Sequence, residues 1–415
     1  MTAGRSLRIA LLTYRGNPHS GGQGVYVRYL SRALAELGHR VEVFSGPPYP
    51  ELDDGIGFTK VPSLDLYRAE DPFRVPRREE FQGATDVLEF ALMCTAGFPE
   101  PLTFSLRVAR LLRDRAGDFD VVHDNQGLGY GLLHTARRYP VVATVHHPVS
   151  IDRRLDLLRA SGLKKRISLQ RWYAFTRMQR RVARRLPQLI AVSQSGRDET
   201  IREFGVAERK VAVVSNGVDT DLFRPLPEVP RVPGRLITTA SADVPLKGLI
   251  YLIEAVAKLR TEAPAELVVV GAPRPGSEVD RALDRLDVRD AVRFEGRVDW
   301  GRLVRLYAEA QVAVVPSLYE GFSLPAAEAM SCGLPLVATT GGALPEVTGD
   351  QGRVALLVPP ADPSALSLAI STLLADEPLR TRMGAAGRAR ALELFSWDRA
   401  AEETVAVYER VMTAC

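Results

Sequence analysis

Short runs of apolar and β-branched residues recur along the chain, and each is followed by a polar or glycine-containing turn and then by a helical pattern. In the first half these runs are "LRIALLTY", "VEVFSG", "DVVHDN", "VVATVHH", "LIAVSQS" and "VAVVSNG"; in the second half they are "RLITTAS", "ELVVVGA", "VRFEGR", "VAVVPS", "PLVATTG" and "ALLVPP". Continuous apolar strands that alternate with helices are typical of parallel sheets covered on both faces. The two groups of six predict an α/β protein with two doubly wound, Rossmann-like domains.

A proline-rich stretch, "NGVDTDLFRPLPEVPRVPGR", separates the two groups of strands and has the composition of a linker. We therefore expect an N-terminal domain over residues 1–228 and a C-terminal domain over residues 229–395. The last segment, 396–415, has apolar residues at helical spacing. This pattern predicts a helix, and we expect it to cross back to the N-terminal domain.

Cysteine usage and hydropathy indicate where the protein works. Cys94, Cys332 and Cys415 lie far apart and match no metal-binding or redox spacing, so we expect free thiols in a reducing compartment. No stretch approaches the roughly 20 apolar residues of a membrane span, and the N-terminal apolar run is too short for a signal peptide. We expect a cytoplasmic protein, with a position on the inner face of the membrane left open.

The positive charge of the chain is concentrated in residues 153–185, which contain twelve Lys and Arg residues and one acid. At helical spacing, Trp172, Phe175, Val182 and Leu186 share an apolar face. A basic amphipathic helix can lie on an anionic membrane, attract a soluble anionic acceptor, or simply pack its aromatic residues into the N-terminal domain. These alternatives stay open. Nucleic acid is not expected as a partner, because no recognised binding motif accompanies the basic residues.

A glycine-rich loop, "RGNPHSGGQGVYVRYL", follows the first strand, and a helix is expected to begin near Val25. Backbone N–H groups at a helix start favour an anion, and glycine lets the anion approach closely. A dinucleotide is a poor candidate, because "VEVFSG" ends without the acidic residue that would hold a ribose. The loop therefore indicates either a phosphate site or a flexible turn.

Two glutamates, Glu320 and Glu328, stand in the otherwise apolar and small-residue stretch "SLYEGFSLPAAEAMSCG". A carboxylate in such surroundings costs free energy unless it is paired or faces a ligand. Glu320 is expected in a loop and Glu328 about one turn inside a helix that starts near Leu324. Eight helical positions separate two backbones by about 12 Å, more than the roughly 5–9.5 Å of a glycosidase carboxyl pair. The two glutamates more naturally hold different parts of one elongated ligand, with its phosphate at the helix start between them.

This layout resembles the family-4 retaining glycosyltransferases of the GT-B fold, whose best-known motif has two glutamates separated by seven residues. The stretch "EGFSLPAAEAMSCGLPLVATTGGALPEV" carries that likeness. Agreement continues in "SGGQGVYVRYLSRALAELGHRVEVFS", "VSNGVDTDLFRP", "KGLIYLIEAVAKL", "LVVVGAPR", "VRFEGRV" and "MGAAGRARALELFSW". The matches span nearly the whole chain in the family's order. The resemblance implies two Rossmann-like domains that face each other across a cleft.

The resemblance implies a role on the donor nucleotide for several positions. Glu328 would accept hydrogen bonds from the ribose, and Arg297 and Val298 in "EGRV" would lie near the base. Gly22 would approach the diphosphate from the N-terminal domain. The backbone amides that would support the sugar and the diphosphate are those of Gly321, Phe322, Ser323 and Leu324.

Three further residues would act at the reacting carbon, again by resemblance. Glu320 would bind donor-sugar hydroxyls, and Lys247 in "ADVPLKG" would neutralise the leaving diphosphate. His146, the first histidine of "ATVHHP", would touch the donor sugar, although His147 is equally near the strand end. The implied reaction retains the α configuration and uses no metal. It needs no cofactor beyond the donor, a UDP- or GDP-hexose, and its acceptor is open.

One position departs from the family pattern, because Ser241 stands where the family usually has an arginine that pairs with its lysine. Arg15 or Arg274 is a candidate to replace that cation. "DTD" at 219–221 resembles a metal-binding motif of another transferase fold, but after "NG" it is more typical of a turn and a helix cap. Two other functions also suit the scaffold: a nucleotide-sugar epimerase and a non-catalytic nucleotide-sugar-binding protein.

Overall fold

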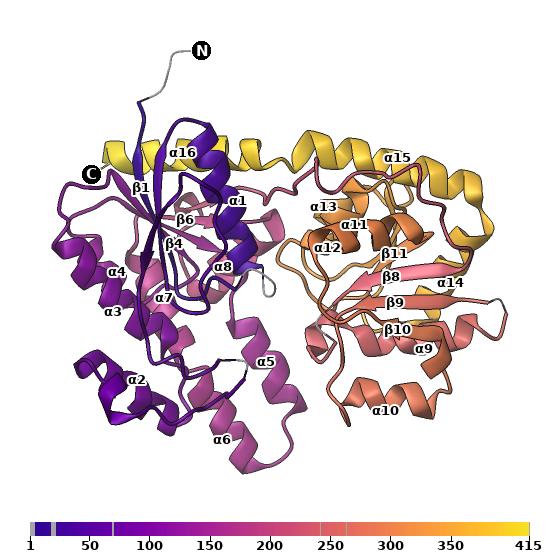
Figure 1. Ribbon diagram of the computed structural model, residues 1–415, viewed down its shortest axis with the longest axis horizontal. Coiled ribbons are helices and arrows are strands. Elements are labelled where there is room, and N and C mark those ends of the chain that lie inside the picture. The colour runs from indigo at the N-terminus through magenta and orange to yellow at the C-terminus, as the bar shows by residue number, and fades with distance from the viewer. Residues whose placement is uncertain (1–4, 18–21, 69, 241, 263, 415) are drawn as a thin grey trace. The chain divides into compact units, whose positions relative to one another are not determined.

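The computed structural model describes residues 5–17, 22–68, 70–240, 242–262 and 264–414, and its chain forms two compact units. Unit 1 consists of Met1–Val214 and Trp397–Cys415, and unit 2 of Ser215–Ser396. Each unit is an open sheet of parallel strands with helices on both faces (Figure 1). The expected α/β class with two Rossmann-like domains is confirmed.

The sheet of unit 1 has the strand order β3-β2-β1-β4-β5-β6-β7. Its strands are β1 (Arg8–Thr13), β2 (Arg40–Ser45), β3 (Gly57–Lys60), β4 (Val121–Asn125), β5 (Val141–Val145), β6 (Gln188–Ala191) and β7 (Val211–Val213). Six of them match the predicted runs. The seventh, β3, was missed because "GFTK" at the edge of the sheet is largely exposed and carries no apolar run.

Helices cover both faces of this sheet because successive residues of a strand point to opposite faces. Ile9 and Leu11 of β1 pack with α1 and α16, whereas Ala10 and Leu12 pack with α3 and α7. The helices are α1 (Gln23–Glu36), α2 (Ala84–Cys94), α3 (Glu100–Arg113), α4 (Gly131–Thr135), α5 (Ser150–Arg159), α6 (Leu163–Trp172), α7 (Phe175–Arg185), α8 (Gln194–Phe204) and α16 (Trp397–Ala414).

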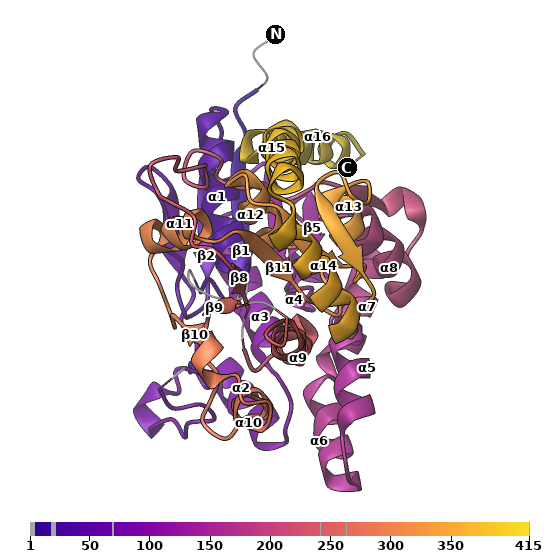
Figure 2. The ribbon, with the colours of Figure 1, turned by 90° about the vertical axis from the view of Figure 1, so that its right-hand side faces the viewer.

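Unit 2 has a six-stranded parallel sheet in the order β10-β9-β8-β11-β12-β13. Its strands are β8 (Arg235–Thr239), β9 (Glu266–Val270), β10 (Val292–Phe294), β11 (Val312–Val315), β12 (Leu336–Thr339) and β13 (Ala355–Val358), all within the predicted runs. Its helices are α9 (Leu249–Leu259), α10 (Glu278–Arg285), α11 (Trp300–Glu309), α12 (Leu324–Ser331), α13 (Leu344–Thr348), α14 (Pro363–Ala375) and α15 (Glu377–Leu394). Figure 2 shows α9 and α14 against the strands of this sheet, where their leucines join its core.

The division between the units lies at Val214–Ser215, so the expected boundary near Glu228 is wrong. The proline-rich stretch is not a free linker, because its first half packs on unit 2. The Phe223 ring meets the Tyr307 ring edge-on at 6.2 Å. The Ser331 hydroxyl donates to the Phe223 carbonyl (2.6 Å), and Arg388 donates to the same carbonyl (2.9 Å). The proline content predicted an irregular backbone correctly, but it did not indicate that this stretch packs on unit 2.

The C-terminal helix α16 belongs to unit 1, as the amphipathic pattern of the last segment suggested. The Trp397 ring stacks on Tyr29 with centroids 5.6 Å apart. Tyr408 is fully buried, and its hydroxyl lies 2.6 Å from Nδ1 of His123. Nε2 of His123 lies 2.7 Å from the Thr144 hydroxyl. Burial lowers the pKa of His123 to about 3, so the ring is neutral and both nitrogens are hydrogen-bonded.

Replacing Tyr408 by Phe should destabilise the protein, because it leaves Nδ1 of buried His123 without a partner. The expected loss is ~1–3 kcal/mol of unfolding free energy, measured by urea titration. Tyr251→Phe is the matched control, since the Tyr251 hydroxyl on α9 has no hydrogen bond within the described chain, and it should cost far less. Equal losses in the two variants would show that the His123 contact contributes nothing.

Candidate functional site

The candidate site of unit 2 lies at the carboxyl ends of β8 and β11. These strands are neighbours in the sheet although they are far apart in the chain, so the direction of winding reverses between them. Such a reversal leaves a crevice at the carboxyl ends, where open α/β sheets bind ligands. The loop after β8 leads to Lys247, and the loop after β11 leads to Glu320. A hydrogen bond from Leu318 N to the Leu246 carbonyl (2.7 Å) joins the two loops.

Glu320 and Lys247 form an ion pair in this site. Nζ of Lys247 lies 2.8 Å from Oε1 of Glu320, and the Ser317 hydroxyl donates to the same oxygen at 2.7 Å. The Glu320 side chain is 9% exposed and that of Lys247 31% exposed. A buried carboxylate requires such partners to remain ionised. The sequence singled out both residues, but it did not predict that they contact each other, nor that Ser317 takes part.

Two glycines allow these loops to approach so closely. Gly248 has φ +64°, and a Cβ there would lie 2.0 Å from the Pro316 carbonyl oxygen. Gly342 has φ +63°, and a Cβ there would lie 2.2 Å from the Glu320 carbonyl oxygen. Any larger residue at either position would push the loops apart. The backbone on both sides of the Lys247–Glu320 pair is therefore held in one arrangement.

Helix α12 begins at this site, at Leu324, in the segment that follows Glu320. Ser323 precedes its first residue, Leu324, and has φ 88° and ψ 82°, a left-handed conformation that non-glycine residues seldom adopt. Its hydroxyl accepts a hydrogen bond from Ala326 N at 3.4 Å. Phe322 is buried against Phe395 (5.3 Å between centroids), while Gly321 is partly exposed. Strain of this kind persists where a site requires it, and a helix start favours an anion.

Glu328 lies one turn further along α12 and is buried. Burial raises the pKa of its carboxyl to about 7, although the Tyr307 hydroxyl donates to Oε2 at 3.1 Å. Tyr307 comes from α11 and was not foreseen, because a tyrosine on a helical apolar face carries no signal of its own. Among the described residues, the side chains of Glu320 and Glu328 have no hydrogen-bond partner in common. This arrangement suits the prediction that they hold different parts of a ligand.

The remaining predicted positions of unit 2 lie on other loops at the same edge of the sheet. Arg297 and Val298 follow β10, and Arg297 is exposed; their role near a base stays a prediction. Ser241 lies outside the described residues. Arg274 bonds to Oδ2 of Asp243 (2.9 Å) and is 81% exposed. Asp219 accepts a hydrogen bond from Leu222 N (3.0 Å), as expected of a turn cap in "DTD".

Unit 1 gathers a second polar cluster, at the carboxyl ends of β1, β4 and β5. Nε2 of His146 lies 2.6 Å from Oδ1 of Asn125, and Asn125 Nδ2 donates to the Gln23 carbonyl at 3.3 Å. Gly22, with φ +73°, caps α1 beside them. The Tyr26 ring meets His146 edge-on at 4.7 Å. Burial lowers the pKa of His146 to about 3, so this imidazole is neutral at physiological pH.

Gln126 holds the backbone of the two adjacent histidines, whose rings turn in different directions. Its Oε1 accepts from His146 N (2.6 Å), and its Nε2 donates to the His147 carbonyl (2.9 Å). Gln126 has φ 59°, another left-handed conformation in a site loop. The His147 ring turns the other way, with Nε2 2.8 Å from Asp152 of α5. His146, not His147, belongs to the cluster with Asn125.

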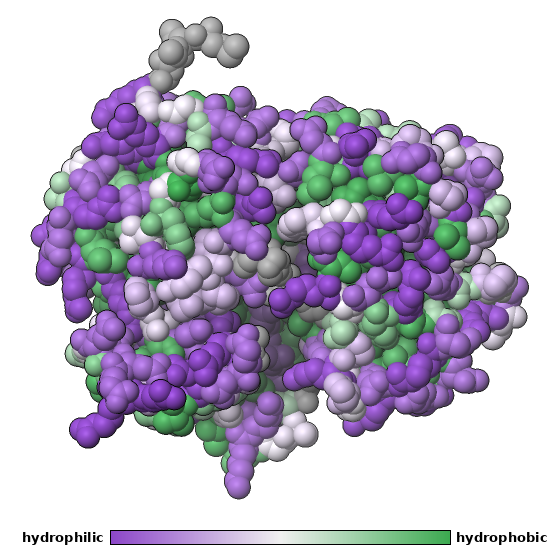
Figure 3. Space-filling model, in the orientation of Figure 1, coloured by the Kyte–Doolittle hydropathy of each residue, from purple (hydrophilic) through white to green (hydrophobic). Residues whose placement is uncertain are grey.

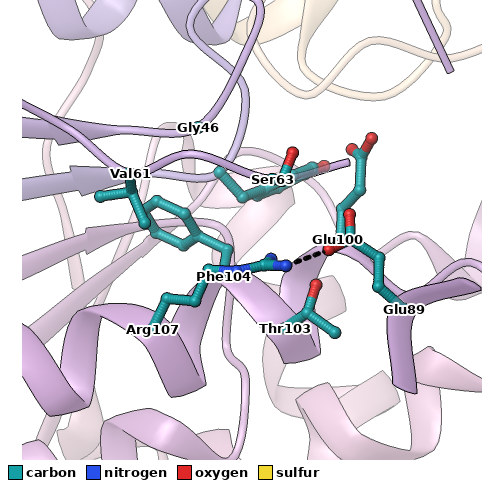
Figure 4. Close-up of a pocket in the computed structure, with 9 residues that line it drawn as sticks. Gly46, Val61, Ser63, Glu89, Glu100, Thr103, Phe104 and Arg107 are labelled. Atoms are coloured by element: carbon teal, nitrogen blue, oxygen red, sulfur yellow. Dashed lines mark hydrogen bonds and ion pairs between the residues drawn. The ribbon is translucent and has the colours of Figure 1, made fainter. Parts of the chain in front are cut away.

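A small pocket in unit 1, which the sequence did not indicate, lies near the ends of β2 and β3 (Figure 4). Arg107 forms an ion pair there with Glu89. Nε of Arg15 lies 3.0 Å from Oε2 of Glu100. Arg15 is thus held in unit 1 by the carboxyl group of Glu100. Burial raises the pKa of Glu100 to about 8, against the opposing effect of Arg15. The pocket is lined by Tyr14, Gly46, Val61, Ser63, Glu89, Glu100, Thr103, Phe104 and Arg107.

Family models match both units. The model described as "Glycosyltransferase Family 4" matches residues 20–222, and the model described as "Glycosyl transferases group 1" matches residues 233–376. A curated relative, the MMP alpha-(1->4)-mannosyltransferase of Mycolicibacterium hassiacum, is 52% identical over 408 residues, which cover 98% of each chain. The D-inositol 3-phosphate glycosyltransferase of Kineococcus radiotolerans is 30% identical, over 98% of this chain and 95% of its own.

Solved structures share the fold. Sucrose-phosphate synthase from Thermosynechococcus elongatus aligns with a TM-score of 0.75 at 23% identity, over 99% of this chain and 100% of its own. The Anabaena protein HepE, in complex with UDP-glucose, aligns with a TM-score of 0.70 at 18% identity, over 97% and 100% of the two chains. These likenesses agree with the two Rossmann-like units.

The buried carboxyl of Glu100 should make stability depend on pH. Its pKa is raised in the folded state, so it remains protonated while the unfolded chain ionises near pH 4.5; stability then falls as pH rises from about 4.5 to about 8. Relative to Glu100→Gln, the wild type should lose up to about 1.4 kcal/mol per pH unit in this window, measured by urea unfolding. Glu79→Gln, at an exposed position, should run parallel to the wild type. A pH-independent difference for Glu100→Gln would contradict the buried-acid account.

Proposed function

This chain belongs to glycosyltransferase family 4, and from that premise we propose that it transfers a hexose from a nucleoside diphosphate sugar to an acceptor hydroxyl with retention of configuration. The observation that carries the proposal is the Lys247–Glu320 pair (2.8 Å) beside the strained start of α12. A cation, a carboxylate and a helix start placed together suit a sugar joined to a diphosphate.

Unit 2 supplies the groups for the donor. Lys247 and the N–H groups from Gly321 to Leu324 face the diphosphate, since both favour negative charge. Buried Glu328, fixed through Tyr307, accepts hydrogen bonds from the ribose hydroxyls. Arg297 and Val298 lie near the base. Among the described residues of the loop after β8, Lys247 provides the cation, and Arg274, which is paired with Asp243, is a candidate for a second one.

The reaction needs no side chain as nucleophile. The bond between the sugar's anomeric carbon and the diphosphate oxygen breaks, and the acceptor oxygen bonds to the same face of that carbon. The acceptor's proton passes to the departing phosphate oxygen. Lys247 stabilises the charge that develops on that phosphate, while Glu320 and neutral His146 hold sugar hydroxyls. No step in this scheme calls for a metal ion.

Mannose is the sugar that we propose, because the relative of 52% identity is named as an alpha-(1->4)-mannosyltransferase. The donor is then a GDP- or UDP-hexose, and the acceptor is the hydroxyl of a glycan or of a lipid-linked glycan. We place the reaction in the cytoplasm, where Cys94 and Cys332, both free thiols, remain reduced. None of the helices in the described ranges combines the length and the hydropathy that a membrane span requires.

Incubation with a panel of GDP- and UDP-hexoses and a mannoside acceptor tests this function. The product glycoside should keep the α configuration of the donor by NMR, and turnover should survive EDTA. A β-product would overturn retention, and recovery by Mg²⁺ after loss in EDTA would overturn metal independence. Release of free nucleotide with an altered sugar and no acceptor would identify an epimerase. Donor binding that Glu320→Ala weakens, without turnover in the wild type, would identify a binding protein.

Donor affinity should depend on pH through Glu328. Ribose hydroxyls donate to the ionised carboxyl, whose pKa is about 7 in the free protein, so affinity should fall as pH drops below 7. Glu328→Gln should weaken binding roughly tenfold or more, since a hydrogen bond to a charged group contributes ~1.5–3 kcal/mol, and should flatten the pH profile. Calorimetry with an intact nucleotide sugar measures both. Glu377→Gln, exposed on α15, is the matched control. Unchanged affinity in Glu328→Gln would remove this residue from the site.

A further inference from the structure

Helices α5 and α6 form a hairpin that extends away from the sheet of unit 1. Both ribbon views show it reaching beyond the other helices near it (Figures 1 and 2). The turn between the helices contains Gly162 with φ +85°. No residue of α6, from Leu163 to Trp172, is fully buried. A helix gains most of its stability by packing an apolar face, so this helix is unusual in leaving its first two turns uncovered.

The tip of the hairpin combines exposed apolar and basic side chains. All eight residues of 161–168, "SGLKKRIS", are exposed. Leu163 is 74% and Ile167 48% exposed, and Leu158 at the end of α5 is 77% exposed. Between them stand Lys164, Lys165 and Arg166. Figure 3 shows hydrophilic side chains where this end of unit 1 projects. Within the described chain, these three cations have no hydrogen bond or ion pair to an acid.

The neighbouring helix α7 has a structural role, because its apolar face packs into unit 1, which is one of the alternatives that the sequence left open. Val182 of α7 and Leu186 directly after it are fully buried in the core of unit 1. Trp172, at the end of α6, also packs on unit 1, with its ring 5.1 Å from that of Phe98. Arg184 donates to the Phe204 carbonyl (2.7 Å), and Arg181 donates to the Tyr130 hydroxyl (3.0 Å). The apolar face found in the sequence is therefore core, and part of the basic residues hold unit 1 together.

We propose that the tip of the hairpin, residues 158–167, docks on an anionic lipid surface. Positive charge interleaved with exposed leucine and isoleucine is the composition of segments that lie at a membrane interface. The cations complement anionic headgroups, and Leu158, Leu163 and Ile167 enter the acyl boundary. A second copy of the chain is a poorer occupant, since two such tips would bring like charges together.

The base of the hairpin connects the tip to the polar cluster of unit 1. Helix α5 starts at Ser150, directly after the loop that carries His146. Asp152 in its first turn bonds to the His147 ring (2.8 Å), and Asp156 accepts from the Tyr173 hydroxyl (2.7 Å). The hairpin therefore connects a membrane at its tip to the loop with His146, which we assign to the sugar. Such docking suits an acceptor that is carried in the membrane.

Co-sedimentation with vesicles tests the proposal. Wild type at 0.15 M salt should sediment with phosphatidylglycerol–phosphatidylcholine vesicles, scarcely with phosphatidylcholine alone, and much less at 0.5 M salt, where screening is stronger. The variant Lys164→Gln/Lys165→Gln/Arg166→Gln should lose roughly two orders of magnitude in partition coefficient, because each cation near an anionic surface contributes about fivefold. Leu163→Ser/Ile167→Ser should also bind more weakly, but should keep the salt dependence.

Arg110→Gln/Arg137→Gln/Arg138→Gln is the matched control, since it removes the same charge from exposed positions elsewhere on unit 1. It should bind vesicles nearly as the wild type does. Equal losses of vesicle binding in the two triple variants would show that only the net charge of the protein matters, and would overturn the proposal. Absence of wild-type binding, or self-association through the tip without vesicles, would also overturn it. The assay contains no donor, so its outcome does not depend on the transferase reaction, and melting curves verify that the variants fold.

Discussion

The burial of charge at the carboxyl ends of two parallel sheets is the constraint on which this structure depends. Glu320 lies in a largely dry position, where Lys247 and Ser317 both contact one of its carboxyl oxygens. That contact in turn requires two loops to meet, which glycine at 248 and 342 permits. The charged pair and the loop packing depend on each other, and the strained start of α12 lies in the segment that follows Glu320. A change in any of them would disturb the others.

In unit 1, the buried polar groups in the strands and at their carboxyl ends include two neutral histidines. Burial lowers the pKa values of His146 and His123 to about 3, so both rings are neutral at physiological pH. Each ring forms hydrogen bonds with uncharged partners. Through Thr144 and Tyr408, these bonds reach the C-terminal helix. The contacts of His146 and His123 in unit 1 are thus between neutral groups, whereas the Lys247–Glu320 contact of unit 2 is an ion pair. This difference agrees with the proposal that Lys247 faces a diphosphate and His146 a hydroxyl group.

Much of the fold could be predicted from the sequence, and part of the site. Twelve of the strands appear as apolar runs because parallel sheets bury both of their faces. The exposed edge strand β3 lacks that signal and was missed. The division between the units was misplaced because proline marks irregular backbone, whereas the packing of Phe223 decides which unit holds it. Glu320, Glu328, Lys247 and His146 were identified by motif, but Tyr307, Ser317 and Asn125 were not, since each is ordinary in its local context.

The sequence by itself determined the type of fold, the family and the loops that carry the chemistry, because these depend on periodicity and on short local motifs. Only the tertiary structure decided which charges meet. It paired Lys247 with Glu320 across the 73 positions that separate them in the chain, and it turned His146 toward Asn125 but His147 toward Asp152. It also divided one basic stretch into a packed helix and an exposed tip. Contacts between residues distant in the chain arise from packing, which no local pattern encodes.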